Sequence, residues 1–265
     1  GGGGGGGGGL KTPVVAIYST FIQRAYDQIL HDVCLQNLPV IFCLDRAGLV
    51  GEDGATHHGV FDISFLRTIP NINILAPKDE NELKQMLFAA VEKNKPVAIR
   101  YPRGAGSGIE IENVKKLDWG KAEVVYKTLA PEIVIFAVGS MVQISIEAAK
   151  ILAEKKIFAE VVNSRFIKPF DREFVKIKAE NVKLFVTAEE GILNGGFGSA
   201  VAEFLADENI SVPILRFGIA DRFIEHGSRS QLLEMCGLTS KKIAEKISEK
   251  LSGEEDIKIY SRNKV

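Results

Sequence analysis

The 265-residue chain contains 46% hydrophobic and 25% charged residues, a composition typical of a folded globular protein rather than a disordered or fibrous one. Its 33 basic and 34 acidic residues leave a formal net charge of -1 at pH 7, so the overall charge gives no reason to expect nucleic acid or an acidic membrane surface as a partner. The length accommodates two ordinary domains, each with its own core.

Three cysteines, Cys34, Cys43 and Cys236, are widely spaced and form no C-x-x-C pair, which argues against a disulfide framework and against a zinc site. No apolar run reaches the roughly 20 residues of a membrane-spanning helix, and no leader-like segment opens the chain. We therefore expect a soluble protein that is not secreted. The chain opens instead with Gly1–Gly9, which we interpret as a linker or placeholder and as a sign that native sequence upstream of Leu10 is missing.

From residue 12 onward, short β-branched runs alternate with stretches whose apolar residues recur at helical spacing. In the first half this pattern predicts helices at about 22–33 and 79–93 and strands at 14–18, 40–44, 72–75 and 96–100. A polar, glycine-rich stretch at 46–59 is longer than an ordinary connection, and long ordered loops are frequently functional. The alternation favours parallel β/α architecture.

The periodicity is lost over residues 105–118, where we expect an interdomain linker. It resumes with helices near 142–154 and 240–251 and strands at 133–138, 158–162, 184–187 and 213–217. The predicted fold class is therefore α/β, with two consecutive parallel-sheet β/α domains. Their expected bounds are 10–104 and 119–252, followed by a charged tail at 253–265.

Ligands of open α/β sheets bind beyond the carboxyl ends of the strands, so chemistry is expected in the segments that follow the predicted strands. Arginine forks bind phosphate and carboxylate groups, and histidine moves protons near neutral pH. The candidate side chains suit a phosphorylated carbonyl compound, although the residue types alone identify no reaction. They are Tyr18, Phe21, Arg24, Arg46, Asp53, His57 and Arg103.

Several motifs in the chain carry a resemblance to a known family. The runs Y-S-T-F, Q-R-A-Y-D-Q, D-R-A-G, D-G-A-T-H and Y-P-R-G begin at residues 18, 23, 45, 53 and 101 and occur in that order. Together they resemble the 1-deoxy-D-xylulose-5-phosphate synthases, which are transketolase-like enzymes. The similarity runs from Leu10 to about Leu251 and includes R-F-I-K-P and T-A-E-E-G in the second half. It covers a C-terminal portion of the family: a transketolase pyrimidine-binding domain, incomplete at its start, and a transketolase C-terminal domain.

The resemblance implies a decarboxylating condensation of pyruvate with D-glyceraldehyde 3-phosphate, carried out on thiamine diphosphate with magnesium. Such a transferase feeds non-mevalonate isoprenoid synthesis and, in many organisms, thiamine and pyridoxal synthesis. It also implies a homodimer without nucleic-acid or membrane partners. The compartment would be the bacterial cytoplasm or the plastid stroma.

The resemblance also assigns binding roles. Phe21 would stack on the aminopyrimidine ring of the cofactor, and Arg24 would help to order that pocket, although a surface position along its helix accounts for Arg24 equally well. Arg46 and Arg103, with Tyr18 nearby, would bind the acceptor phosphate or the carboxylate of an intermediate.

Asp53 and His57 are the catalytic residues that the resemblance implies, because they would handle protons and hold the intermediate before decarboxylation. The family's cofactor-activating glutamate and its magnesium ligands belong to sequence that precedes the strand beginning near Thr12, and that sequence is absent. No metal ligand is therefore predicted in this chain. Negligible cofactor affinity and turnover are predicted for the chain alone.

Three further motifs are better explained by structure. His58 is interpreted as structural. The glycine-rich run at 195–199 resembles a phosphate cradle but lacks a P-loop lysine, so close packing of a helix on a strand is the better account. Glu189 and Glu190 are adjacent on a strand end and should face opposite sides, which disfavours a catalytic carboxylate pair.

Two alternative functions stay open at this stage. The first is the β subunit of a thiamine-diphosphate-dependent 2-oxo acid dehydrogenase, which would need a separate α partner. The second is a noncatalytic dimerisation module with a transketolase fold. The D-R-A-G and D-G-A-T-H runs argue against the first, and the intact loop residues argue against the second.

Overall fold

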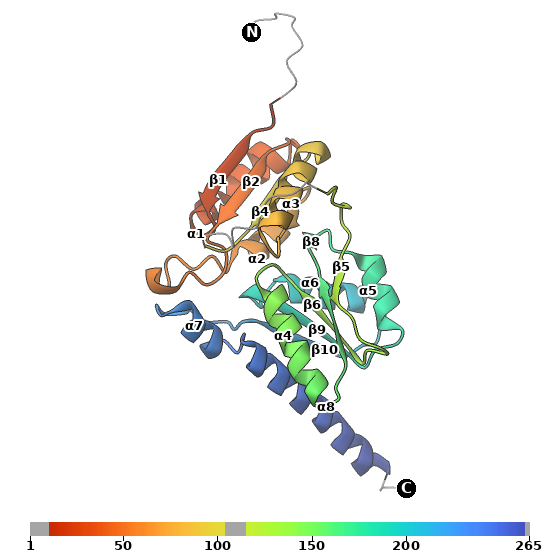
Figure 1. Cartoon of the computed structure of the whole chain (residues 1–265). Coiled ribbons are helices and arrows are strands. Elements are labelled where there is room, and N and C mark those ends of the chain that lie inside the picture. Colours follow the sequence, from red (N-terminus) through yellow and green to blue (C-terminus); the bar gives the residue numbers. More distant parts are fainter. Residues whose placement is uncertain (1–10, 104–114, 263–265) are drawn as a thin grey trace, which may run out of the picture.

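The computed structural model describes residues 11–103 and 115–262, with side chains described up to Gly253. Two five-stranded sheets lie one above the other in Figure 1, and helices flank both. Gly1–Gly9 and most of the expected linker at 105–118 lie outside the described residues.

The first sheet is built mainly by the N-terminal half. Its spatial order begins with four parallel strands, β1 (Val14–Tyr18), β2 (Ile41–Asp45), β4 (Val97–Arg100) and β3 (Asn73–Leu75). The central strands are buried almost throughout, as expected for parallel strands covered on both faces. The last strand, β8 (Phe166–Lys168), comes from the C-terminal half and pairs antiparallel with β3. Both halves of the chain therefore contribute to this sheet.

The second sheet belongs to the C-terminal half. Its order is β10 (Ile214–Ile219), β9 (Leu184–Ile192), β6 (Ile133–Ala137), β7 (Ala159–Asn163) and β5 (Glu123–Tyr126). The first four strands are parallel, and β5 joins antiparallel at the edge. Strand β9 is buried along its whole length. Its carboxyl end points toward the first sheet, which places the final residues of β9 at the junction between the two halves.

Helices cover both sheets, and side chains in the sequence explain several of their starting points. Asp79 and Asp171 each accept a hydrogen bond from a backbone N–H in the first turn, and Ser228 forms a capping box with Gln231. The helices are α1 (Ser19–Ile22), α2 (Asp62–Arg67), α3 (Glu80–Lys93), α4 (Met141–Glu154), α5 (Arg172–Ala179), α6 (Phe197–Asp207), α7 (Arg229–Met235) and α8 (Ser240–Arg262), with the 3-10 turns η1 (Gln23–Ala25) and η3 (Gly51–Asp53) and the π-helix η2 (Gln28–Cys34).

One hydrophobic cluster joins the two sheets. It contains Phe42 and Ile74 from the first sheet together with Phe136 and Phe185 from the second. The rings of Phe136 and Phe185 meet edge to face, with centroids 5.1 Å apart, and burial of such a side chain contributes about 1.5–3 kcal/mol. Separate clusters fill the outer face of each sheet. The two halves are therefore packed against each other through apolar side chains.

The predicted α/β class with two sheets is confirmed, while several elements differ from expectation. Strands β5 and β8 were not predicted, because each is only three or four residues long and joins a sheet edge antiparallel. The single helix expected at 22–33 is divided among α1, η1 and η2. Helix α8 continues past Leu251, where the predicted helix ended, to Arg262.

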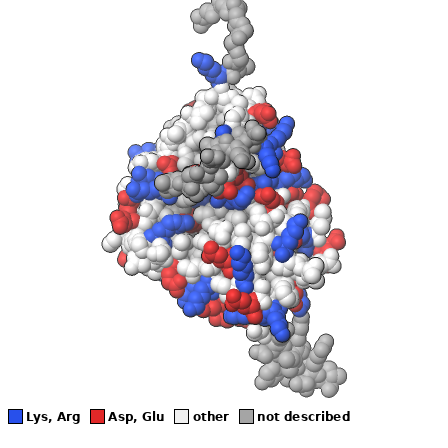
Figure 2. Space-filling model, viewed as in Figure 1, with Lys and Arg blue, Asp and Glu red and all other residues white. Residues whose placement is uncertain are grey.

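Within the described ranges, no helix is both long and apolar enough to cross a membrane. On the face shown in Figure 2, basic and acidic side chains of the described residues are interspersed. The local pattern matches the near balance of basic and acidic residues in the whole sequence.

Candidate functional site

The aromatic and cationic residues predicted for the site lie together at the end of β1 and in the segments that follow β2. The rings of Tyr18 and Phe21 are stacked, with centroids 5.3 Å apart and planes at 17°. His57 meets the Phe21 ring edge-on at 5.9 Å, and the Arg46 guanidinium lies 4.1 Å from the centroid of Tyr18. Arg24 is more peripheral, 6.0 Å from the Phe21 centroid. Phe21 is 38% exposed, so this aromatic surface is accessible to a ligand.

A carboxylate shared by two arginines forms the polar side of the same cluster. Asp53 Oδ2 accepts hydrogen bonds from Arg46 Nη1 and Arg103 Nη1, each at 3.1 Å. These ion pairs are partly exposed, and such pairs contribute only about 0–1 kcal/mol to stability. Arg46 Nε is buried and has no hydrogen-bond partner among the described residues. The arrangement therefore stabilises the fold little, and its guanidinium groups are of the kind that bind anions.

The backbone between residues 45 and 59 holds these side chains in place. Arg46 has a positive φ of 54°, and its N–H donates to Asp45 Oδ1 at 2.7 Å. Gly48 and Gly59 exchange two backbone hydrogen bonds, of 2.7 and 2.8 Å. This pair closes the base of a loop, residues 48–59, that carries Asp53 and His57; we call it the site loop.

His57 and its neighbour His58 have different surroundings. His57 Nδ1 lies 2.9 Å from Thr56 Oγ1, and Thr20 Oγ1 donates to Thr56 O at 2.8 Å, which connects this end of the loop to α1. His58 is buried. Its Nδ1 accepts from Val50 N at 3.1 Å, so its Nε2, 3.1 Å from Glu225 O, is the donor. These contacts support the interpretation of His58 as structural.

The sequence indicated structural rather than catalytic roles for Glu189 and Glu190, but it did not indicate which groups these two buried carboxylates near the end of β9 contact. As expected from strand geometry they point to different partners. Glu189 accepts from Phe197 N and Gly198 N, both at 2.8 Å, and thereby caps α6. A Cβ at Gly196 would lie 2.4 Å from Glu189 Oε2. The glycine-rich run at 195–199 therefore serves close packing, and the chain's own carboxylate occupies the position that a phosphate would take.

Burial sets the protonation of Glu189. Desolvation raises its pKa to about 7, although the two backbone donors and the charges of Arg100 and Arg216 act in the opposite direction. The ordinary value is 4.5. The folded protein therefore binds this proton more tightly than the unfolded chain does.

This shift predicts a pH dependence of stability. The contribution of Glu189 is fully present below pH 4.5 and is lost as the pH rises through about 7. We expect the free energy of unfolding to fall by up to about 3 kcal/mol over this window because of Glu189, and a Glu189→Gln variant to lack that part of the fall. Urea titrations of both proteins at several pH values measure the difference, and parallel pH profiles would contradict it.

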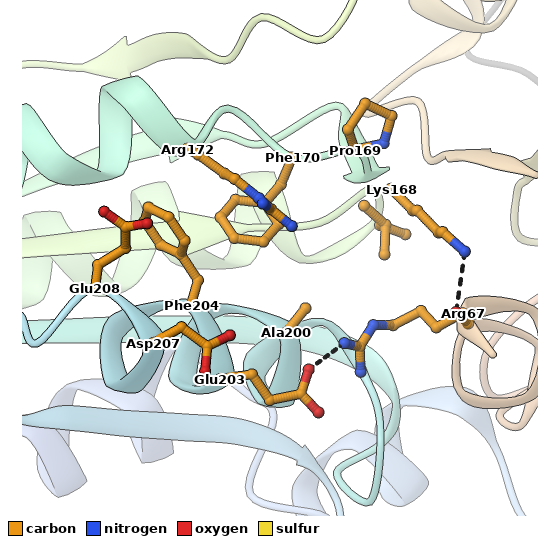
Figure 3. A pocket seen from close by; sticks show the side chains of 11 residues that line it. Arg67, Lys168, Pro169, Phe170, Arg172, Ala200, Glu203, Phe204, Asp207 and Glu208 are labelled. Atoms are coloured by element: carbon orange, nitrogen blue, oxygen red, sulfur yellow. Dashed lines mark hydrogen bonds and ion pairs between the residues drawn. The ribbon is translucent and has the colours of Figure 1, made fainter. Parts of the chain in front are cut away.

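A cavity of about 250 Å³ lies apart from this cluster, between α2, α6 and the segment after β8 (Figure 3). Arg67 pairs with Glu203 at 2.5 Å across it, and Lys168 Nζ donates to the carbonyls of Arg67 and Ile69. Burial lowers the pKa of Lys168, and the charge of Arg67 adds to the effect. Because its cations are already engaged by the chain, we regard this cavity as a joint between the two halves.

The described residues contain no group of three or more histidine, cysteine or acidic side chains that could hold a metal ion. The donors in the candidate site are instead arginines, a histidine and aromatic rings. Aromatic rings are groups that stack on planar rings, and arginines are groups that bind anions.

Comparison with known proteins places the chain among transketolases. The pyrimidine-binding domain model of transketolase matches residues 5–107, and the C-terminal domain model matches residues 120–243. A solved structure described as a split gene transketolase, inactive beta4 tetramer, is 30% identical with a TM-score of 0.79, over 91% of this chain and 76% of that one. The chain belongs to the transketolase family.

Within that family, the chain is similar to one particular enzyme. It is 54% identical to the 1-deoxy-D-xylulose-5-phosphate synthase of Gloeobacter violaceus and 53% identical to that of Pelotomaculum thermopropionicum, in each case over 91% of this chain. It spans 38% of the length of each relative. A transketolase structure from Pichia stipitis, 20% identical with a TM-score of 0.72, shares the fold.

Proposed function

We propose that this chain is the C-terminal part of a 1-deoxy-D-xylulose-5-phosphate synthase. The observation that carries the proposal is the cluster of Tyr18, Phe21, Arg46, Asp53 and His57, in a chain more than half identical to enzymes of that name. The proposed reaction breaks the carboxyl C–C bond of pyruvate and releases carbon dioxide. The remaining two-carbon unit then forms a new C–C bond with the aldehyde carbon of D-glyceraldehyde 3-phosphate.

Thiamine diphosphate is the proposed cofactor, and when bound it supplies the electron sink for the loss of carbon dioxide. The described residues fit its ring end, because Phe21 offers an exposed aromatic face beside Tyr18. Arg24, near the Phe21 ring, is proposed to order that pocket. For the diphosphate and Mg²⁺, we propose ligands in sequence that the longer relatives have and this chain lacks.

The cations of the site are proposed to bind the anionic groups of the substrates. Arg46 and Arg103 both contact Asp53, and a bound carboxylate or phosphate would compete with Asp53 for their donors. Arg46 has an additional unused Nε–H. Tyr18 holds the Arg46 guanidinium against its ring. His57, beside Phe21, is proposed to hold and transfer the proton during C–C bond formation.

The complete protein is proposed to work as a homodimer in the bacterial cytoplasm or the plastid stroma, and to feed non-mevalonate isoprenoid synthesis and thiamine synthesis. The chain alone is proposed to be inactive, because the partial length relative to its relatives leaves the cofactor's diphosphate without its expected ligands.

Two preparations test the proposal: the chain alone, and the complete protein that contains it. Each is incubated with pyruvate, D-glyceraldehyde 3-phosphate, thiamine diphosphate and Mg²⁺, and the deoxypentulose phosphate is measured by mass spectrometry. We expect product from the complete protein only. Absence of product from an intact complete protein would contradict the synthase function, and product from the chain alone would contradict its inactivity.

The same assay tests a second possibility, a two-chain enzyme, because the chain covers 76% of a split gene transketolase. In that case the missing portion is a separate polypeptide, and the chain would be one subunit of a two-chain enzyme. Addition of that polypeptide to the chain would then restore product formation without a covalent connection.

A further inference from the structure

The site loop is held from outside its own half of the chain, by the carboxylate of Glu190. This side chain is 1% exposed at the end of β9. Its Oε1 accepts from Leu49 N at 2.7 Å, a contact that spans 141 residues of sequence. Leu49 follows the base of the site loop directly and lies three residues after Arg46. The second sheet thus holds the site loop by a buried, charge-assisted hydrogen bond.

The remaining lone pairs of the Glu190 carboxylate are also used. Arg229 donates to Oε1 at 3.1 Å and to Oε2 at 2.8 Å, and Ser140 Oγ donates to Oε2 at 2.6 Å. The bidentate arginine compensates the buried negative charge and fixes the plane of the carboxylate. Arg229 is the first residue of α7, and Ser140 precedes α4. The Glu190 carboxylate of β9, which accepts from Leu49 N, therefore also contacts α7 and the segment before α4.

The backbone around Gly48 makes this contact close. Gly48 has a φ of +84°, and a Cβ there would lie 2.6 Å from Glu190 Oε1. The carbonyl of Glu190 accepts from Arg100 Nη2 at 3.0 Å, and the same nitrogen lies 3.3 Å from Gly59 O. Gly48 therefore lies against Glu190 itself, and Gly59 contacts Arg100, which is hydrogen-bonded to Glu190. These two glycines form the base of the site loop.

The far side of the site loop also contacts the C-terminal half of the chain. Gly51 O accepts from Gly227 N at 3.5 Å, and His58 donates to Glu225 O. In Figure 1 the loop projects at the left of the first sheet, directly above α7. Asp53 and His57 lie between these attachments.

Building on the function proposed above, we propose that Glu190 is a positioning residue for that reaction. Its carboxylate, oriented by Arg229, sets the conformation of the site loop so that Asp53 and His57 face Arg46 and the aromatic pair. The C-terminal half thereby tunes pyruvate turnover without contributing a group that touches the substrate.

The test compares Glu190→Gln with Glu189→Gln in the complete protein. Both replace a buried carboxylate on β9 by its amide, but Glu189 accepts its hydrogen bonds from the start of α6 rather than from the site loop. Hydrogen exchange is measured peptide by peptide, and kcat and KM for pyruvate are measured separately. For Glu190→Gln we expect at least about tenfold faster exchange over residues 48–59 and at least about tenfold lower kcat/KM for pyruvate. Glu189→Gln should accelerate exchange at the start of α6 and leave residues 48–59 unchanged.

Several outcomes would overturn the proposal. If hydrogen exchange over residues 48–59 is unchanged in Glu190→Gln, the proposal is wrong whatever the activity. If exchange there is faster but kcat/KM for pyruvate is unaltered, the proposal is also wrong. If Glu190→Gln does not fold, Arg229→Gln replaces it as the test variant, because Arg229 is partly exposed. For Arg229→Gln we expect kcat/KM for pyruvate to fall about threefold. An inactive wild-type protein would contradict the synthase function itself. The hydrogen-exchange result for residues 48–59 does not depend on that function.

Discussion

An Asp62→Ala variant of this chain is expected to lose about 3–5 kcal/mol of unfolding free energy, the range found when one partner of a buried ion pair is removed. Asp62 and Arg100 are both buried, and Arg100 Nε donates to Asp62 Oδ2 at 2.9 Å. Burial opposes the charge on Arg100, but the charge and hydrogen bond of Asp62, together with the charges of Glu190 and Glu189, outweigh it, so the pKa of Arg100 is raised. Without Asp62, a buried guanidinium would keep only carbonyl partners.

Urea denaturation measures this loss. Glu249→Ala is the control, because Glu249 pairs with Lys246 on the exposed surface of α8 and such pairs contribute about 0–1 kcal/mol. A double variant, Asp62→Ala with Arg100→Met, should recover part of the stability because it removes the unpaired charge. A loss below about 1 kcal/mol for Asp62→Ala would show that water or a shifted carboxylate compensates Arg100.

The position of ligand sites in parallel sheets explains how much of the candidate site could be predicted from the sequence. In parallel sheets the carboxyl ends of the strands meet at one edge, so residues after β1, β2 and β4 were expected near one another. The structure places Tyr18, Arg46 and Arg103 together in this way. The sharing of Asp53 between the two arginines could not be predicted, because it depends on the path of the site loop and on a positive φ at Arg46.

The parts of the fold that escaped prediction involve contacts distant in sequence. Strand β8 has three residues, too few for any periodicity, and it pairs with a strand that ends some 90 residues earlier in the chain. The role of Glu190 depends on Leu49, which lies far away in the sequence. One signal was available: the apolar run that begins β9 is followed by two acidic residues, Glu189 and Glu190, and carboxylates on a buried strand require partners.

In the complete protein, Arg46→Ala and His57→Ala are expected to reduce product formation at least about 100-fold. Arg46 lies on Tyr18 and contacts Asp53, and removal of one preorganised donor to a reacting anion lowers rates about 10²–10³-fold. His57 lies beside the exposed Phe21 ring, and general acid–base catalysis contributes about 10²–10⁴-fold. Carbon dioxide release and deoxypentulose phosphate formation are the two measurements.

The two variants should separate binding from chemistry. If Arg46 binds the substrate anion before the reaction, Arg46→Ala raises the KM for pyruvate or for the aldehyde phosphate, whereas His57→Ala mainly lowers kcat. Arg172→Ala is the matched control, because Arg172 stacks on Phe170 and Phe204 in the cavity between α2 and α6, apart from the cluster. Wild-type kinetics in both site variants would contradict the roles proposed for Arg46 and His57.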